Sequence, residues 1–222
     1  MKFYKKAILP LGFEANALSA GIKKNNKLDL ALFYSAYPAK VAGVFTSNRI
    51  QANPIKLDKM NLKRNKAFQA LIVNSGNANC FTGENGFRDC LKITKELAKH
   101  LNIRKESILL SSTGIIGKPL PIKKILNAIP LLVRGLSRKG IDKAKRAILT
   151  TDTFTKEITC RFNLGKSKIT ICGVAKGAGM VSPNLATMLC FIFTDLNITK
   201  RALDKVLKLV VQDTFNCISI DG

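Results

Sequence analysis

The sequence predicts an α+β fold, a layered α/β sandwich, as a single domain over residues 1–222. Short apolar stretches have the length and composition of strands, and other segments repeat apolar residues at helical spacing. The two kinds alternate irregularly along the chain. With 222 residues, 46% of them hydrophobic, the chain can bury a sizeable core.

The first half of the chain predicts strands joined by polar turns. We expect strands within residues 1–10 and at residues 67–73, and two more joined through Pro38. That pair covers residues 28–34 and 41–46. Residues 74–79 are turn formers except for one alanine, so they predict a loop.

The middle of the chain predicts helices. Residues 85–101 have an amphipathic pattern, and a short strand at 107–110 runs into a loop of hydroxyls and glycines at 111–117. Helices follow at 122–136, where Pro130 should break or kink the chain, and at 141–147.

The last third predicts a hairpin followed by one helix. Residues 148–153 should end a strand in polar residues, and 157–164 should pair with 168–174. We further expect a buried strand at 188–193, a helix around 203–211 and the start of a strand at 217–220.

The composition excludes several classes of protein. A net charge of +23 raises nucleic acid as a partner, but the lysines are scattered opposite apolar stripes, which favours a solvated surface. No apolar run is long enough for a membrane span, so a transmembrane segment is excluded. The six cysteines form no CxxC pair and only one histidine is present, so neither a zinc site nor a disulfide framework is expected, and a reducing cytoplasm is the expected location.

The familiar catalytic patterns are largely absent. His100, the single histidine, lies at the edge of a helical stripe, where a structural role is expected. Gly177 and Gly179 lack the pattern of a phosphate-binding loop. What remains is hydroxyl chemistry, with threonines at three strand ends or junctions, residues 112–114, 150–153 and 186–188.

A threonine can act as a nucleophile without histidine if it becomes the first residue of a chain, because its own α-amine is then the general base. Glycines and Pro183 permit an unusual backbone before Thr187, and Ala186 leaves its carbonyl uncrowded. The Ala186–Thr187 bond could therefore be attacked by the Thr187 hydroxyl. The alternative is a simple glycine turn before a buried strand.

The segment Lys-Gly-Ala-Gly-Met-Val-Ser-Pro-Asn-Leu-Ala-Thr-Met-Leu at residues 176–189 resembles the self-cleavage motif of a known family. That family is the bifunctional ornithine acetyltransferase/glutamate N-acetyltransferase family of arginine biosynthesis. Further segments agree with it in order, at residues 43–48, 74–79, 112–117, 150–153 and 219–222. The resemblance covers essentially the whole chain, although family members continue past the position of Gly222.

The resemblance implies a self-processing enzyme of the N-terminal-nucleophile type. Cleavage between Ala186 and Thr187 would leave residues 1–186 as an α chain and residues 187–222 as the start of a β chain, with Thr187 as nucleophile. The Thr113 hydroxyl would form the oxyanion hole.

The resemblance gives the backbone N–H of Gly114 as the second donor of that oxyanion hole. Thr153 and Lys176, together with Thr187, would contact substrate. The family reaction moves an acetyl group from N-acetylornithine to Thr187 and then to glutamate, with no bound cofactor, and some members use acetyl-CoA as donor. The assembly implied is a heterotetramer of two α and two β chains.

Two alternatives stay open. One is a related self-processing aminopeptidase or amidase, in which water resolves the acyl-enzyme. The other is a basic protein without catalysis, which would bind nucleic acid or another anion in a salt-dependent way.

Overall fold

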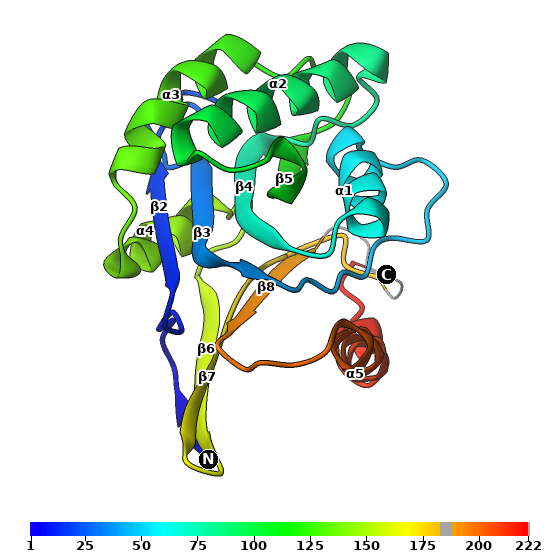
Figure 1. The fold of residues 1–222 in the computed structure, drawn as a ribbon. Coiled ribbons are helices and arrows are strands. Elements are labelled where there is room, and N and C mark those ends of the chain that lie inside the picture. The colour runs from blue at the N-terminus through cyan, green and yellow to red at the C-terminus, as the bar shows by residue number, and fades with distance from the viewer. Residues whose placement is uncertain (183–187, 222) are drawn as a thin grey trace.

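A computed structural model describes residues 1–182 and 188–221 and contains two four-stranded sheets (Figure 1). The first sheet has the order β2-β3-β4-β5 and the second has the order β1-β6-β7-β8. Among the strands of the described residues, β4 and β5 alone pair in parallel. The strands of the first sheet are Phe13–Leu18, Leu30–Ala39, Phe68–Asn77 and Ile108–Ile115, and those of the second are Lys2–Tyr4, Lys156–Leu164, Ser167–Lys176 and Leu189–Thr194.

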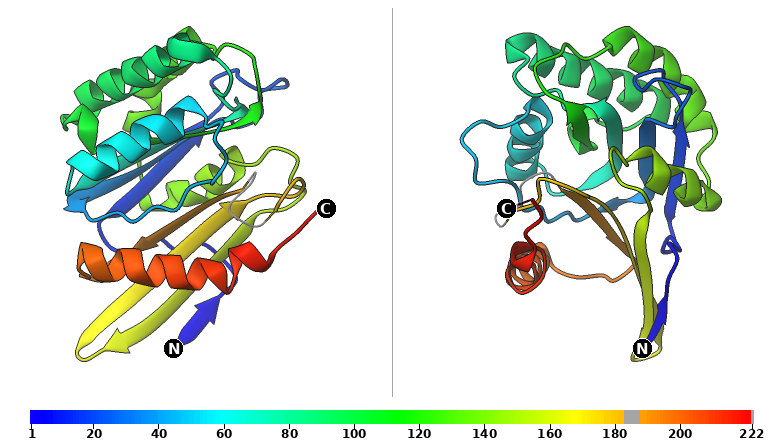
Figure 2. Two further views of the ribbon diagram at one scale, coloured as in Figure 1. Left: turned by 90° about the vertical axis from the view of Figure 1, so that its right-hand side faces the viewer. Right: turned by 180° about the vertical axis from the view of Figure 1, so that it is seen from behind.

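Helices cover the outer face of the first sheet. There α1 (Asn53–Arg64), α2 (Gly83–Leu101) and α3 (Ile122–Arg134) bury their apolar sides (Figure 1). The short α4 (Ile141–Ala147) packs on the opposite face of β2 and β3, whereas α5 (Lys200–Gln212) lies beside the second sheet (Figure 2). This layered arrangement confirms the predicted α+β class. Three 3-10 helices complete the described elements: Lys105–Ser107, Arg138–Gly140 and Phe215–Cys217.

The central strand β3 has two buried faces, which explains its nearly continuous apolar sequence. Leu30 and Leu32 point into the core beneath α1, α2 and α3. Ala31 and Phe33 alternate with them and point into a second core, shared with α4 and the second sheet. The ring of Phe33 stacks on that of Phe193 in β8, with 5.0 Å between centroids. The two sheets therefore meet through an aromatic contact.

Two strands extend further than the sequence indicated. We expected loops at 74–79 and 111–117, but β4 continues to Asn77 and β5 to Ile115. The polar side chains there have partners inside the fold: the Ser112 hydroxyl donates to Asn74 Oδ1 at 2.6 Å, and the Asn74 amide donates to the carbonyl of Asn77. Because these groups are satisfied, turn-forming residues remain in the sheet.

Other local predictions were wrong. Residues 41–46 form no strand, and β3 instead runs through Pro38. Residues 148–153 are a connection after α4. Residues 217–220 follow the end of a 3-10 helix at Cys217 and form one bridge, Val181 to Ile220, rather than a strand. The sequence reading also missed β2 and α1.

Pro130 lies inside α3 without ending it. A proline in a helix interior costs about 3 kcal/mol. Each of the fully buried Ile125, Ile129 and Leu132 gains roughly 1.5–3 kcal/mol from burial, so packing outweighs the lost hydrogen bond. The helices expected at 85–101 and 141–147 and the hairpin formed by β6 and β7 are confirmed.

Candidate active site

Thr113 and Gly114 lie near the carboxyl end of β5, beside the carboxyl end of the parallel strand β4. Gly114 lies opposite Gly76 in the β4–β5 register, and both have a positive φ, +132° and +100°. A Cβ on Gly114 would lie 2.4 Å from the Gly76 carbonyl carbon, closer than any side chain can approach. Glycine at 114 is therefore required by contact as well as by conformation.

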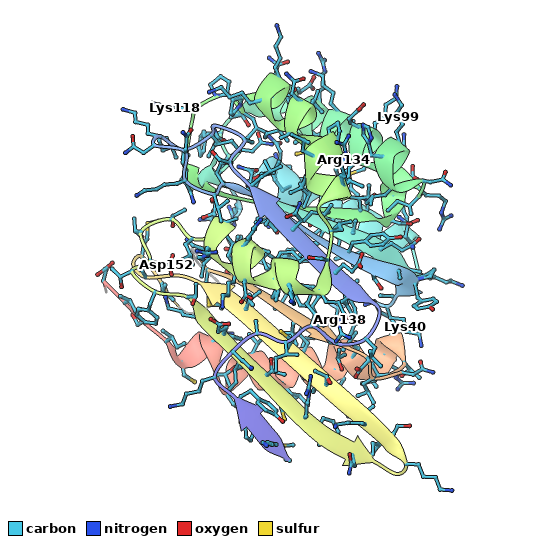
Figure 3. The ribbon with its side chains drawn as sticks, turned by 90° about the vertical axis from the view of Figure 1, so that its left-hand side faces the viewer. Lys40, Lys99, Lys118, Arg134, Arg138 and Asp152 are labelled. Carbon is cyan, nitrogen blue, oxygen red and sulfur yellow. The ribbon has the colours of Figure 1, made fainter. Side chains whose placement is uncertain are left out.

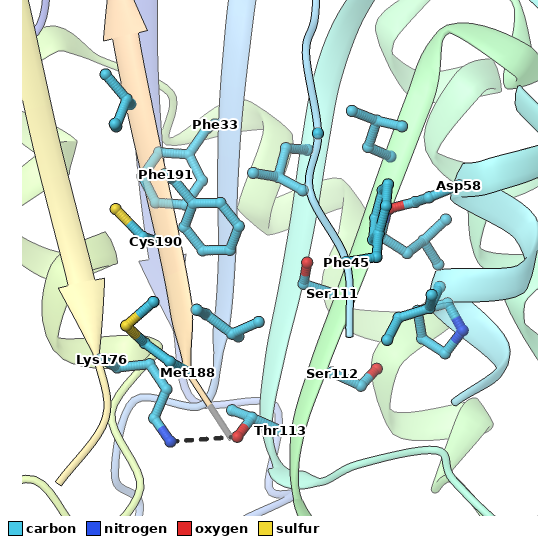
Figure 4. A pocket seen from close by; sticks show the side chains of 18 of the residues that line it. Phe33, Phe45, Asp58, Ser111, Ser112, Thr113, Lys176, Met188, Cys190 and Phe191 are labelled. Atoms are coloured by element: carbon cyan, nitrogen blue, oxygen red, sulfur yellow. Dashed lines mark hydrogen bonds between the residues drawn. The ribbon is translucent and has the colours of Figure 1, made fainter. Parts of the chain in front are cut away.

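Lys176 reaches these residues from the second sheet, as the last residue of β7. Its Nζ donates to Thr150 Oγ1 at 2.7 Å. It also donates to Thr113 Oγ1 at 3.3 Å (Figure 4). The residue is only 3% exposed. Burial lowers the pKa of the Lys176 ammonium, which Asp152 partly restores and Lys156 lowers again. Since Thr113 Oγ1 accepts this bond, its own hydrogen is left to donate elsewhere.

Asp152 is the carboxylate beneath the lysine. Its side chain is fully buried; Oδ1 accepts from the Gly177 N–H and from Lys156 Nζ, both at 2.8 Å, and Oδ2 lies 4.0 Å from Lys176 Nζ. Burial alone would raise the pKa of Asp152. The hydrogen bonds from Lys156 and from the Gly177 and Thr150 amides outweigh burial and hold the pKa below its usual range.

A cavity of about 2280 Å³ opens in front of these groups. Its lining is mostly apolar and includes Phe33, Phe45 and Phe191, with Thr113 and Lys176 together at one end (Figure 4). Thr150, which Lys176 contacts, lines the same cavity. Small-molecule sites usually measure about 300–1,000 Å³, so a metabolite would occupy only part of this space.

Three of the predicted site residues come together here: Thr113, Gly114 and Lys176. Ala186 and Thr187 lie outside the described residues, but Met188, the next residue along the chain, lines the same cavity. A Cβ on Gly177 would lie 3.3 Å from Met188 Cγ, so Gly177 and Met188 lie next to each other although ten residues separate them in the sequence.

Thr153 is exposed, and among the described residues the cavity is lined by Thr150 and Thr151 instead. Its contact with substrate stays a prediction. The polar run at 150–153 was visible in the sequence, but nothing in it distinguished Thr150 or Asp152 as site residues. Their signal was the run itself, which carries one carboxylate among three hydroxyls.

Cys190 and the histidine are poorly suited to nucleophilic chemistry at this site. Cys190 lines the cavity, but burial raises the pKa of its thiol to about 11, so the thiolate is scarce near neutral pH. His100 lies on α2, where its Nε2 is 3.0 Å from Glu96 Oε1. Within residues 1–182 and 188–221 no three His, Cys, Asp or Glu side chains are grouped to hold a metal ion.

The surface charge is spread over the molecule. Lys40, Lys99 and Lys118 are exposed on different parts of the fold (Figure 3). In the described part of the chain no helix is long and apolar enough to cross a membrane.

Comparison with known proteins identifies the family. Residues 14–222 match the model of the ArgJ family. This chain belongs to the ArgJ family. The arginine biosynthesis bifunctional protein ArgJ of Caldanaerobacter subterraneus subsp. tengcongensis is 48% identical over 217 residues, which cover 98% of this chain and 53% of that protein. The ArgJ 1 protein of Clostridium acetobutylicum is 46% identical, over 94% of this chain and 51% of that protein.

The ArgJ-family chain thus spans about half the length of the curated relatives it matches, and the expectation that family members are longer is confirmed. Solved structures agree on the fold. ArgJ of Bacillus halodurans superposes with a TM-score of 0.76 at 32% identity, over 85% of this chain and 98% of that one. Ornithine acetyltransferase of Mycobacterium tuberculosis, solved in complex with ornithine, gives 0.77 at 34% identity, over 83% and 99%.

Proposed function

We propose that this chain carries the acetyl-transfer site of an ornithine acetyltransferase of arginine biosynthesis. The observation that carries the proposal is the convergence of Thr113, Gly114 and Lys176 at the polar end of one cavity in an ArgJ-family fold. The ornithine in the Mycobacterium tuberculosis structure supports an amino-acid substrate.

The nucleophile of the proposal is Thr187, released by self-cleavage. Its hydroxyl attacks the carbonyl carbon of Ala186, the peptide C–N bond breaks to give an ester and a free α-amine, and water hydrolyses the ester. The lengths of the solved chains support this step. About 85% of this chain's 222 residues align with 98% of the Bacillus halodurans chain, so that chain is about as long as residues 1–186. The curated relatives, in contrast, are about twice as long as this chain.

Acetyl transfer then proceeds through Thr187. The α-amine accepts the hydroxyl proton as the oxygen attacks the acetyl carbonyl of N-acetylornithine, and ornithine leaves with that proton on its nitrogen. The amine of glutamate attacks the acetyl ester and leaves as N-acetylglutamate, which regenerates the hydroxyl. In both steps the Thr113 hydroxyl and the Gly114 N–H would stabilise the oxyanion, a contribution worth about 3–4 kcal/mol per donor in such sites.

Lys176 would bind the carboxylate that both substrates carry. Its ammonium already faces the Thr113 hydroxyl, so a bound carboxylate would hold the acetyl group near the proposed oxyanion hole. Thr153 would complete substrate binding once the segment around it contacts ligand. The assembly that we propose is a heterotetramer of two α and two β chains.

The test is an assay of acetyl transfer from N-acetylornithine to glutamate. It should use the chain alone and the chain joined to the C-terminal half of the Caldanaerobacter relative. We expect N-acetylglutamate to form, and Thr187→Ala to abolish it. Transfer from acetyl-CoA, run in parallel, defines the donor.

Two results would contradict the proposal. Release of free acetate with no N-acetylglutamate would favour the amidase alternative. Strongly salt-dependent RNA binding without any transfer would favour the nucleic-acid-binding alternative.

A further inference from the structure

The start of the segment 177–188 is bound by a buried carboxylate, that of Asp152. Lys176 pairs with Leu189 in the β7–β8 register, so this segment begins and ends on two neighbouring strands. At its start the Gly177 N–H donates to Asp152 Oδ1 at 2.8 Å. The chain preceding β6 therefore anchors the segment that contains the proposed cleavage bond.

The same carboxylate also sets the charge around Lys176. Lys156 binds Asp152 Oδ1, and Lys176 Nζ lies 4.0 Å from Oδ2. Lys23 is the third cation here, with its Nζ on the carbonyls of Leu28 and Leu149. Burial is the main cause that lowers the pKa of Lys23. Repulsion from Lys27 and from Lys176 lowers this pKa further. Asp152 is thus the carboxylate that balances Lys156 and Lys176.

We propose that Asp152 is a positioning residue of the active site: it holds Lys176 beside the Thr113 hydroxyl and fixes the Gly177 amide at the base of the cleaved segment. The inference rests on the proposed function, because it assigns this role within that site. Asp152 need not touch substrate; it acts through the lysine and the amide that it contacts.

The chain offers a matched control in Glu157. This carboxylate is also largely buried, and it accepts from a backbone N–H (Ala7, 2.6 Å), a lysine (Lys145, 2.8 Å) and a hydroxyl (Thr155, 2.9 Å). These partners lie outside the candidate site. Glu157→Gln therefore removes a buried charge of the same kind without disturbing Lys176 or Gly177.

The experiment compares Asp152→Asn, Asp152→Ala and Glu157→Gln by three measurements. They are hydrogen exchange at the Gly177 amide, reaction of Lys176 with acetic anhydride as a function of pH, and the rate of self-cleavage. We expect Asp152→Ala to speed exchange at Gly177, and both Asp152 variants to move the labelling midpoint of Lys176 to lower pH, because a neighbouring negative charge is lost. Cleavage should slow by roughly 10- to 100-fold.

Glu157→Gln should change none of the three measurements, even if it lowers the melting temperature. Unchanged exchange and labelling in both Asp152 variants would overturn the positioning role, and so would equal effects in Glu157→Gln. If the labelling and exchange shifts occur but wild-type chain does not cleave, the positioning role stands and the proposed self-processing fails.

Discussion

At the scale of single residues, the geometry of the candidate site depends on one close backbone contact and one side-chain hydrogen bond. Gly114 faces the backbone of Gly76 so closely that a methyl group would overlap it. Thr113, one residue earlier, accepts a hydrogen bond from Lys176 at its hydroxyl oxygen, and an ammonium cannot accept the hydroxyl hydrogen in return. The sequence named all three site residues through family resemblance, but the reason for glycine at 114 became visible only when β4 and β5 were seen side by side.

Replacing Gly114 by alanine should damage the site through contact. Both Gly114→Ala and Gly117→Ala place a side chain at positive φ, which costs about 1–3 kcal/mol. Only at 114 is the added Cβ blocked, since Gly117 has open space around it. We expect Gly114→Ala to lower the free energy of unfolding by clearly more than Gly117→Ala and to abolish acetyl transfer. Urea denaturation measures both free energies of unfolding. Equal decreases in the two variants would show that the close contact of residue 114 with the Gly76 backbone is not what destabilises Gly114→Ala.

Asp58 on α1 should make stability depend on pH. Burial raises the pKa of its carboxyl well above the usual value, against the opposing effect of the Leu110 N–H that it accepts at 3.0 Å. The folded protein therefore holds this proton more tightly than the unfolded chain, and stability falls as pH rises above the unfolded pKa.

Asp58→Asn keeps an acceptor for Leu110 and cannot ionise. Its stability relative to wild type should therefore increase between about pH 4 and about pH 8. Urea denaturation at both values checks this. A stability difference that does not change with pH would show that the carboxyl is not protonated in the folded protein.

At the scale of elements, strong apolar periodicity predicted helices correctly, whereas polar residues in the sequence were wrongly taken to mark loops. α2 and α4 were predicted because their buried stripes repeat at helical spacing. The ends of β4 and β5 were not, because Asn74 and Ser112 look like turn residues until their partners across the sheet are known. α1 was missed as well; it buries three polar residues, Asn53, Asp58 and Asn61, so its inner face does not read as apolar.

The last helix, α5, is the least supported by packing. Val206, Leu209 and Val210 are each about half exposed, and Val211 is its single fully buried residue. We expect the amides of α5 to exchange hydrogen much faster than those of α2, whose stripe of Cys90, Ile93 and Leu97 is buried. Mass spectrometry of peptides after exchange measures this. Equal protection in the two helices would mean that α5 is covered in solution.

At the scale of the whole molecule, the site exists because two sheets meet. Thr113 and Gly114 come from the first sheet and Lys176 from the second. The pairing of Phe33 with Phe193 holds the two together further along the same interface. Order along the chain cannot give this arrangement, since the three site residues lie on strands whose docking is set by packing. The fold class was predictable because it needs only element types, and family resemblance provided Thr113, Gly114 and Lys176, but neither indicated Thr150 or Asp152.

The central claim is that Thr187 becomes an N-terminal nucleophile by self-cleavage, and N-terminal sequencing with intact-mass measurement tests it most directly. The chain should be purified alone and joined to the C-terminal half of the Caldanaerobacter relative. We expect a fragment that begins with Thr187, Met188 and Leu189, and no such fragment from Thr187→Ala. Uncut chain in both forms, indistinguishable from the Thr187→Ala variant, would contradict it.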